Sequence, residues 1–501
     1  MCATLSTLML AVPSAWAEDD SYAPRSREQV SSMLRRSMGP GPSSGSVLSI
    51  YRRIARRYRE IFRPPADYNG DGYADLAAAA VDGFATIDEE VNVYYGGPSG
   101  LAVVPDLVIP DPLPDDFEAF SDATFAGDVN GDGYGDLVVG ANSAPGGGAV
   151  YVYFGRRSGL PATPDQVLRA VDTGVQDTRA FGFRVERARD LDRDGYDDII
   201  VSAIATSIED VQDGVVFVYR GGLHGLDTTP SDTLFGSGGF LDNFGNSMCA
   251  TFLNRDRYPD LIIAEQRNVL FGGGSPGRVH IYYGGPGPIG PSADLVLESP
   301  DGPFLGFGQS VSEVGDVNLD GYGDFMVGQP LVDGFTGRAF LYLGGRRGVR
   351  ATPAVTFVPP AGNTGGYFGW EVGGGGDVDG NGIADVAIGE TDASNLAGEA
   401  HVIFGPIWPG RQARTSTRTP DQTLTIDTGG TVAFFGQDVA FIGDVDGNQF
   451  DELLVGAPWL NDVDGGIYVY EGLRRRSLSN TPTLFLPATL TGGAFGISLG
   501  H

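Results

Sequence analysis

The chain has 501 residues and a formal net charge of −31, because 64 acidic residues outnumber 33 basic ones. We expect no nucleic-acid partner, since phosphate backbones repel so acidic a protein. The 77 glycines and 32 prolines indicate a fold with many tight turns.

Residues 1–17 have the pattern of a secretory signal peptide. An apolar run from Leu5 to Val12 precedes Ala15-Trp16-Ala17, which matches a signal-peptidase cleavage site. The run is too short to cross a bilayer, and no later stretch is long and apolar enough to do so. An ordinary apolar tail is the alternative, because the segment lacks a basic start. We expect a secreted protein, extracellular or at the cell surface, without a transmembrane span.

Residues 18–66 are predicted to form a linker and a short basic amphipathic helix. Apolar side chains recur at helical spacing between Val47 and Ile61, and arginines such as Arg52, Arg56 and Arg63 fill the other face. The basic face is suited to docking on the acidic remainder of the chain, on an anionic membrane or on a partner.

From residue 67 onward, one acidic loop followed by an apolar strand recurs seven times, at spacings of 61 to 67 residues. The loops begin at Asp67, Asp128, Asp190, Phe252, Asp316, Asp377 and Asp444. A period near 60 residues is too long for a helical hairpin repeat but fits four short strands with their turns.

Each repeat contains the same four candidate strands. A Phe-Gly pair such as Phe181-Gly182 precedes the acidic loop, and a β-branched run such as 198–202 follows it. An alternating aromatic run such as 149–154 and a short last run such as 166–169 complete the unit. One such sheet cannot bury both faces, but seven sheets stacked radially cover one another.

We therefore predict an all-β fold, a seven-bladed β-propeller of four-stranded blades over residues 67–501. The first loop lacks a Phe-Gly strand before it, whereas an extra pair, Phe495-Gly496, stands near the end of the chain. The C-terminal Phe-Gly strand is thus expected to close the ring.

The acidic loops have the ligand spacing of a calcium site. Oxygen side chains stand at loop positions 1, 3, 5 and 9, a backbone carbonyl at position 7, and glycine at position 6 allows the chain to turn around the ion. A cage without sulfur or histidine favours calcium over zinc or copper. The predicted ligands are Asp67, Asn69, Asp71, Tyr73 and Asp75; Asp128, Asn130, Asp132, Tyr134 and Asp136; Asp190, Asp192, Asp194, Tyr196 and Asp198; Asp316, Asn318, Asp320, Tyr322 and Asp324; Asp377, Asp379, Asn381, Ile383 and Asp385; and Asp444, Asp446, Asn448, Phe450 and Glu452.

These ligands give about six calcium sites, because only the fourth of the seven loops is left out. Two loops depart from the pattern. The seventh has Gln449 in place of glycine and is expected to bind more weakly. The fourth has Phe252 at position 1 and Arg257 at position 6, so a guanidinium there could replace the ion. Solvated hairpin loops without metal are the alternative for all copies. An EF-hand is excluded, because position 12 of the second loop is Val139 rather than Glu.

The pattern resembles the FG-GAP repeats of the integrin alpha-subunit propeller and of related bacterial extracellular proteins. The resemblance rests on the Phe-Gly pairs, the Asp-x-Asx-x-Asx-Gly-x-x-Asp loops and the turn Val455-Gly456-Ala457-Pro458. It implies that the acidic loop joins the first two strands of a blade and holds calcium. It also implies that ligands bind the opposite face.

No catalytic motif is present, neither a Gly-x-Ser-x-Gly elbow nor a phosphate-binding loop. His280 and His401 occupy a repeat position that is aromatic in Tyr151 and Phe340, and we interpret them as core residues. We predict a non-enzymatic, calcium-binding adhesion or binding module for a protein or glycan. A secreted hydrolase or lyase acting at the top face or the central channel is the alternative, because a carboxylate pair is compatible with the sequence.

Binding is expected to use the variable loops opposite the acidic loops, which carry aromatic and acidic residues. The alternative for each of these residues is an ordinary surface position in a loop, without a role in binding. These candidates are Phe84, Asp88, Glu89, Glu90, Phe335, Trp459, Asp462 and Asp464.

Overall fold

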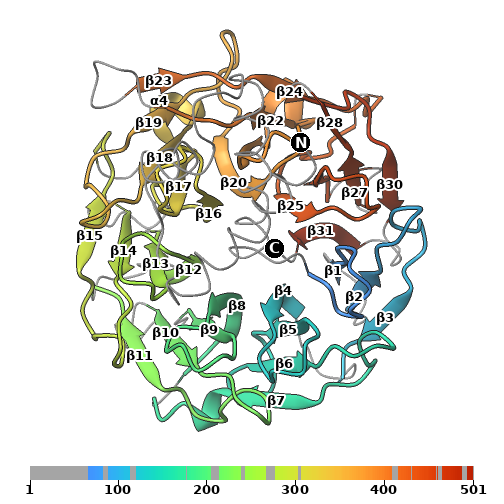
Figure 1. Ribbon diagram of the computed structural model, residues 1–501. Helices are drawn as coiled ribbons and strands as arrows, with labels where there is room; N and C mark the ends of the chain where they lie inside the picture. Colours follow the sequence, from blue (N-terminus) through green and yellow to red (C-terminus); the bar gives the residue numbers. More distant parts are fainter. Residues whose placement is uncertain are drawn as a thin grey trace, which may run out of the picture.

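A computed structural model describes residues 66–499, except for 83–88, 113–119, 176–177, 205–213, 238–242, 267–276, 303–305, 409–415, 430, 459, 461–464, 475 and 488–492. The predicted signal peptide and basic helix lie outside these residues. Seven antiparallel sheets surround a central axis, each with four strands that lie side by side in order from the axis to the rim (Figure 1). The predicted seven-bladed propeller is confirmed. In the described part of the chain, no helix is long and apolar enough to span a membrane.

We number the blades by their acidic loops. Blade 1 contains β1 (Leu76–Asp82), β2 (Glu90–Tyr94), β3 (Leu107–Pro110) and β31 (Gly493–Leu499). Blade 2 contains β4 (Phe120–Gly127), β5 (Asp136–Ala141), β6 (Ala149–Tyr153) and β7 (Gln166–Arg169). Blade 3 contains β8 (Phe181–Arg189), β9 (Asp198–Ala203), β10 (Val215–Tyr219) and β11 (Asp232–Phe235). Blade 4 contains β12 (Phe244–Thr251), β13 (Asp260–Glu265), β14 (Arg278–Tyr282) and β15 (Leu295–Glu298).

The remaining blades follow the same order. Blade 5 contains β16 (Val311–Gly315), β17 (Asp324–Gln329), β18 (Arg338–Leu343) and β19 (Val355–Phe357), with β23 (Ser416–Arg418) added in parallel to β19. Blade 6 contains β20 (Phe368–Gly376), β21 (Asp385–Glu390), β22 (Glu399–Ile403) and β24 (Gln422–Leu424). Blade 7 contains β25 (Val439–Gly443), β26 (Glu452–Gly456), β27 (Gly466–Tyr470) and β30 (Leu484–Pro487). The short elements are η1 (Ala170–Asp172), α4 (Val332–Phe335), α5 (Ala393–Leu396), β28 (Gly472–Leu473) and β29 (Ser477–Leu478).

The first sheet contains strands from both ends of the described chain. β31 lies antiparallel to β1, with Ala78 opposite Leu499 and Val81 opposite Ala494. The C-terminal strand therefore takes the innermost position that β4 or β8 holds in its own blade. This pairing supports the prediction that the C-terminal strand closes the ring.

The core lies between neighbouring blades. Val138, Val150 and Val152 of blade 2 pack in one cluster with Phe181 and Phe217 of blade 3. The Phe181 ring meets the Phe217 ring at 5.7 Å between centroids. Burial of each such side chain contributes about 1.5–3 kcal/mol. The phenylalanine of the Phe-Gly pair is thus the residue that joins one blade to the next.

Blades also meet through their backbones, at a glycine that precedes the third strand. Gly337 of blade 5 forms a parallel bridge with Phe368 of blade 6. Its φ is +82°, and a Cβ atom there would lie 2.1 Å from the Phe368 carbonyl oxygen. Gly148 and Gly398 make the same bridges to Phe181 and Phe435.

We expect Gly337→Ala to lower the free energy of unfolding by about 3 kcal/mol or more, because the added methyl group collides with backbone that cannot move aside. Denaturant titration followed by circular dichroism measures the change. Gly334→Ala is the matched control, since Gly334 also has a positive φ but has open space around its Cβ position. Equal losses in the two variants would contradict the interblade contact.

Candidate metal loops and the opposite face

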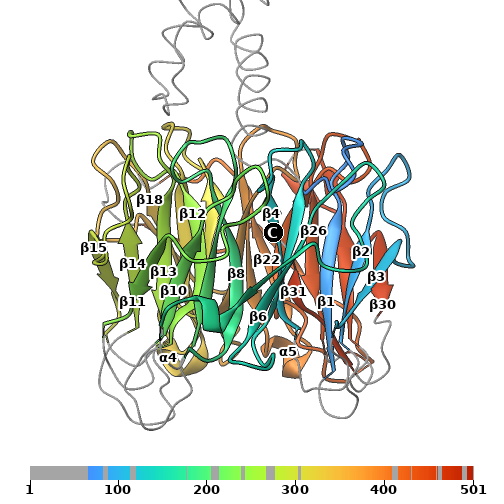
Figure 2. The ribbon, with the colours of Figure 1, turned by 90° about the horizontal axis from the view of Figure 1, so that it is seen from below.

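The acidic loops and the two short helices lie at opposite ends of the propeller. In blades 2 to 7 each acidic loop joins the innermost strand to the second strand, and in blade 1 the loop leads directly into the second strand, β1. The helices α4 and α5 join the second strand to the third. In Figure 2 both helices lie at the lower edge. We call the two ends the acidic-loop end and the α4–α5 end.

Backbone hydrogen bonds fold the second loop around its own oxygen atoms. Asp128 Oδ1 accepts from the Gly131 N–H at 2.7 Å, and its Oδ2 accepts from the Gly133 N–H at 2.9 Å. Asn130 Oδ1 accepts from the Asp132 N–H at 2.9 Å, and Asp132 Oδ1 accepts from the Tyr134 N–H at 3.0 Å. The first loop repeats this pattern. The side chains at positions 1, 3 and 5 are therefore gathered on one side of the turn before any ion binds.

The carboxylate at position 9 has a second role that sequence reasoning missed. Asp136 Oδ2 accepts from the Val129 N–H at 2.8 Å, and its Oδ1 accepts from the Gly155 N–H at 2.9 Å. It thereby connects the acidic loop to the turn after the third strand. The same two bonds recur in five other blades, at Asp75, Asp198, Asp260, Asp324 and Asp385. We call this arrangement the carboxylate clasp.

Burial makes these carboxylates costly to ionise. Removal from water raises the pKa of Asp136 to about 8 and that of Asp75 to about 7, although the backbone donors act in the opposite direction. Burial likewise raises the pKa of Asp316 to about 7, and the nearby Asp320 adds to that shift. A divalent cation in each loop would compensate this negative charge.

The loop residues fit a hard cation. Ligand oxygens of Asp190, Asp192 and Asp194 lie within 4.8 Å of one another, and so do those of Asp377, Asp379 and Asp385. Asn381 Oδ1 at position 5 of the sixth loop is buried without a hydrogen-bond partner, and so is Glu452 Oε1 at position 9 of the seventh. Oxygen atoms left without donors are what a calcium ligand shell requires.

The seventh loop keeps the common shape despite its altered residues. Gln449 adopts a φ of +76°, which places it where glycine stands in other loops. Its N–H donates to Asp444 Oδ2 at 2.7 Å, and Glu452 Oε2 accepts from the Val445 N–H at 2.9 Å. The longer Glu452 side chain thus makes one bond of the clasp.

In the fourth loop, an arginine from the neighbouring blade covers the position that lacks a ligand. The Arg189 guanidinium lies 5.7 Å from the centroid of the Phe252 ring. It also donates to the Ala250 carbonyl at 3.1 Å and pairs with Glu313 of blade 5 at 2.6 Å. Arg189 has a φ of +63°, whereas the residue before the second, fifth and seventh loops is a glycine. Replacement of the ion by Arg257 stays a prediction, but a cationic group from Arg189 is in place.

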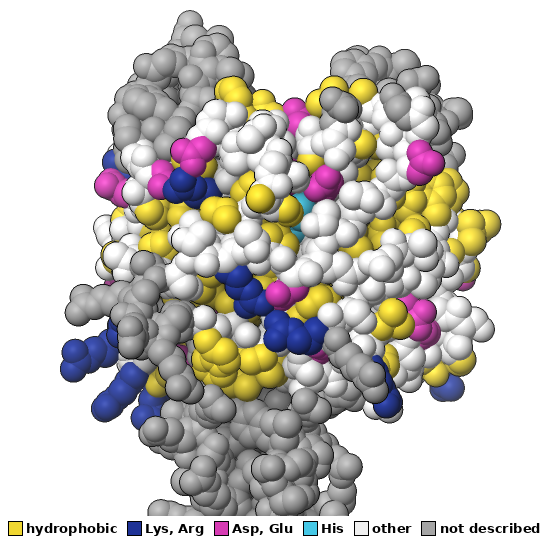
Figure 3. All heavy atoms as spheres, turned by 90° about the horizontal axis from the view of Figure 1, so that it is seen from above, with side chains coloured by type: hydrophobic (Ala, Val, Ile, Leu, Met, Phe, Trp, Pro, Cys, Tyr) yellow, Lys and Arg dark blue, Asp and Glu magenta, His cyan; other side chains and the backbone are white. Residues whose placement is uncertain are grey.

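Arginines also surround the acidic-loop end on its outer side. Figure 3 shows dark blue side chains gathered in the lower half of one side of the molecule. In blade 3, Arg220 donates to Asp198 of the clasp at 2.9 Å, and in blade 2 Arg156 pairs with Asp165 at 2.7 Å. These pairs partly offset the negative charge of this end.

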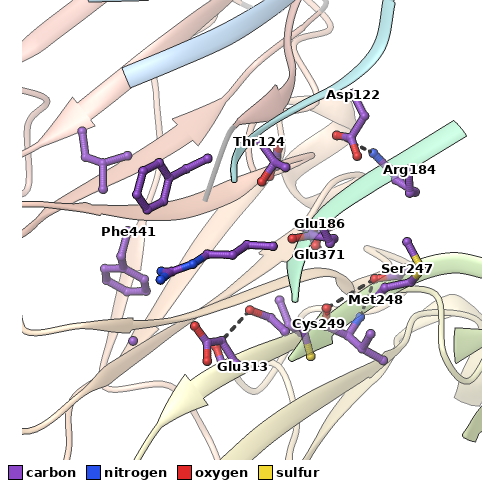
Figure 4. Close-up of a pocket in the computed structure, with 18 of the residues that line it drawn as sticks. Asp122, Thr124, Arg184, Glu186, Ser247, Met248, Cys249, Glu313, Glu371 and Phe441 are labelled. Atoms are coloured by element: carbon purple, nitrogen blue, oxygen red, sulfur yellow. Dashed lines mark hydrogen bonds and ion pairs between the residues drawn. The ribbon is translucent and has the colours of Figure 1, made fainter. Parts of the chain in front are cut away.

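The central channel holds a cavity of about 660 Å³ lined by the innermost strands. Figure 4 shows Arg184 next to Asp122, and the two side chains are 3.4 Å apart. Glu371 lines the same cavity and bonds to the Ser310 hydroxyl. Burial raises the pKa of Glu371 to about 7, while Arg184 lowers it.

The expected ligand-binding residues at the α4–α5 end are described only in part. Phe84, Asp88, Trp459, Asp462 and Asp464 lie outside the described residues. Glu89 accepts a bond from the Phe120 N–H, and Glu90 accepts one from Asn92. Phe335 is half exposed, at 50%. It is therefore the described aromatic candidate that reaches solvent.

Comparison with known proteins agrees with this geometry. Residues 120–153, which span β4, β5, β6 and the second acidic loop, match the family model described as FG-GAP repeat. The chain carries an FG-GAP repeat. The predicted resemblance to the integrin alpha subunits is confirmed by similarity in sequence.

Integrin alpha-PS5 of Drosophila melanogaster is 32% identical over 154 residues, which are 30% of this chain and 15% of that protein. Integrin alpha-6 of Gallus gallus is 34% identical over 142 residues, 27% of this chain and 12% of that protein. Phosphatidylinositol-glycan-specific phospholipase D of Bos taurus is 35% identical over 173 residues, 32% of this chain and 20% of that protein. The FG-GAP chain thus aligns with a fifth or less of each of these relatives. Among solved structures, the Dos1 propeller superposes with a TM-score of 0.42 at 12% identity, over 76% of this chain and 77% of that one.

Proposed function

We propose that this FG-GAP propeller is a secreted, calcium-stabilised module that binds an extracellular protein or glycan at its α4–α5 end. In this proposal residues 1–17 are the signal peptide, 18–66 form a basic segment that docks on the propeller or a partner, and 67–501 form the propeller. A row of aromatic side chains at the α4–α5 end, exposed at Phe335 and half-buried at the other two, supports the binding role.

The aromatic row consists of Phe335, Tyr367 and Trp370. The Phe335 and Tyr367 rings lie 5.3 Å apart between centroids, and the Tyr367 and Trp370 rings lie 6.0 Å apart and perpendicular. Phe335 belongs to α4 of blade 5, and Trp370 of blade 6 lines the central cavity. The row therefore extends from the exposed turn that contains α4 to the central cavity.

The backbone holds the aromatic row in a strained conformation. Phe335 and Tyr367 have φ values of +68° and +61°, a region that costs a residue other than glycine on the order of 1 kcal/mol or more. The Tyr367 N–H donates to the Phe335 carbonyl at 2.8 Å, which fixes the turn of one blade to that of the next. Rigid aromatic anchors bind with little loss of conformational entropy, so the arrangement suits recognition of a protein or glycan surface.

A protein and glycan array with the full-length secreted protein, in calcium, tests the proposal. We expect Phe335→Ala to weaken binding of the strongest ligand by about tenfold or more, the usual effect of removing an aromatic anchor. Leu223→Ala is the matched control, because Leu223 is 73% exposed but lies in a turn at the acidic-loop end. The Leu223→Ala variant should bind the same ligand with the affinity of the unmodified protein.

Two results would contradict the proposal. One is equal loss in the Leu223 and Phe335 variants, which would place the ligand elsewhere. The other is turnover of a polysaccharide or phosphodiester that disappears in Glu371→Gln and persists in Phe335→Ala. That outcome would favour a hydrolase or lyase acting in the central channel, where Glu371 has the raised pKa of a general acid.

A further inference from the structure

Blade 6 contains a buried group of side chains at the α4–α5 end, far along its strands from the acidic loop. Glu390 ends β21 and Glu399 begins β22, and the two residues are direct partners across the antiparallel pair. His401 is two residues further along β22 and so lies on the same face of the sheet. Ligand atoms of these three residues lie within 4.8 Å of one another.

The contacts within this group bring four polar side chains together around one point. His401 Nε2 lies 2.8 Å from Glu390 Oε2 and 3.8 Å from Glu399 Oε2. The amide of Asn363 lies 3.0 Å from each of the same two oxygens. A tetrahedral zinc ion with bonds of about 2.0–2.2 Å separates its ligands by roughly 3.3 Å, so the hydrogen-bonded pairs need to move apart by only about 0.3–0.5 Å to hold one.

Charge gives a reason for an ion at this position. Directly opposed carboxylates destabilise an antiparallel pair, and here the side chains of Glu390 and His401 are fully buried and that of Glu399 is 11% exposed. Glu390 Oε1 is buried and has no hydrogen-bond partner. Two buried carboxylates with one imidazole lack at least one positive charge, which makes the group costly unless a cation completes it.

Outer contacts hold the group as metal ligands are usually held. His401 Nδ1 lies 2.9 Å from the Thr423 hydroxyl, which leaves Nε2 directed at the carboxylates. The Ser394 hydroxyl donates to Glu399 Oε1 at 2.7 Å. The other oxygen, Oε2, faces His401 and Asn363. Such second contacts fix the tautomer of a ligand histidine and the orientation of a ligand carboxylate.

Blade 4 shows what the same positions do without a second glutamate. His280 again pairs with a glutamate that ends the second strand, Glu265. The residue opposite Glu265 is Arg278 instead of a glutamate, and its guanidinium donates to Ser237, which bonds to Glu265. Blade 4 therefore supplies its own positive charge, whereas among the described residues of blade 6 no arginine pairs with Glu390 or Glu399.

We propose that Glu390, Glu399, His401 and Asn363 form a four-coordinate site for a first-row transition metal ion of the zinc class. Asn363 contributes its amide oxygen, since rotation of the amide by half a turn exchanges oxygen and nitrogen. A histidine ligand distinguishes the site from the all-oxygen acidic loops and favours zinc over calcium. The ion would connect the turn before β20, which carries Asn363, to the second and third strands of blade 6. These strands carry the two glutamates and the histidine.

Zinc titration of the chelator-stripped, full-length protein in excess calcium tests the site. We expect one tight zinc equivalent per chain, visible d–d absorption when cobalt replaces zinc, and a higher melting temperature with zinc. His401→Phe places the blade 5 residue in blade 6, and Glu399→Gln removes one charge with little change in shape. Each should weaken zinc binding by about 100-fold or more, whereas the blade 4 control His280→Phe should bind like the unmodified protein.

The stoichiometry of the unmodified protein is decisive even if one variant folds poorly. Absence of a tight zinc equivalent in excess calcium would overturn the site and would show that the group is an ion pair between histidine and glutamate. Equal loss of zinc in the His280 and His401 variants would also overturn it. Neither result depends on ligand binding at the aromatic row, which is measured separately.

Discussion

Asp136→Ala is expected to lower the free energy of unfolding by about 3–5 kcal/mol in chelator, and by more in calcium, because Asp136 is also a predicted ligand of the ion. The buried carboxylate accepts the Val129 and Gly155 N–H groups, and loss of both bonds leaves two donors without partners at about 1–3 kcal/mol each. The clasp thus contributes to the fold independently of any ion. Denaturant titrations of the calcium-loaded and chelated protein measure both values.

Asp132→Ala in the same loop separates the clasp from the metal site. Asp132 is exposed and accepts one bond, from the Tyr134 N–H. We expect this variant to match the unmodified protein in chelator and to lose about 2.7 kcal/mol at a calcium concentration 100 times the dissociation constant. If Asp136→Ala is as stable as the unmodified protein in chelator, the clasp contributes nothing. If Asp132→Ala loses nothing in calcium, the loop holds no ion.

Removal of calcium is expected to lower the melting temperature of the whole propeller by at least about 10 °C. Six loops at a few kcal/mol each would contribute far more than the margin of a typical fold, and 1 kcal/mol corresponds to about 2–4 °C for a large domain. Six ions would also reduce the formal net charge from −31 to roughly −19. Differential scanning calorimetry in millimolar calcium and in chelator measures the shift.

The control for chelation is a return to calcium or to magnesium at the same ionic strength. Calcium should restore the melting temperature, and magnesium should do so less completely, because magnesium demands a stricter octahedral geometry. A melting temperature that does not change in chelator would contradict the metal assignment of the acidic loops.

The repeat pattern predicted the number of blades because each unit carries its own turn and strand signals. Phe181, Phe244 and Phe435, identified from the Phe-Gly pairs, are fully buried between blades. The His280 and His401 rings pack against those of Phe244 and Phe368, with centroids 5.2 Å apart in each pair, as expected for core aromatic positions. The repeat period and the residue types were sufficient to predict the number of blades and the buried aromatic positions, because these features are determined within one repeat.

Contacts between repeats could not be predicted in the same way. The pairing of Glu390 with Glu399 depends on strand register, and the sequence shows only two glutamates nine residues apart. The position of Arg189 over Phe252 depends on how blade 3 packs against blade 4. The one available signal was arginine where other repeats have glycine before the loop, a substitution that calls for a reason because of its positive φ.

The pairing of β1 with β31 has a consequence for the order of folding. The innermost strand of blade 1 comes from residues 493–499, so during synthesis β1 keeps an open edge until the six other blades have emerged. Strand pairing over so long a sequence separation is slow, and an unpaired edge invites association with other chains. Blades 2 to 7 can each complete their four strands from local sequence, whereas blade 1 must wait for residues 493–499.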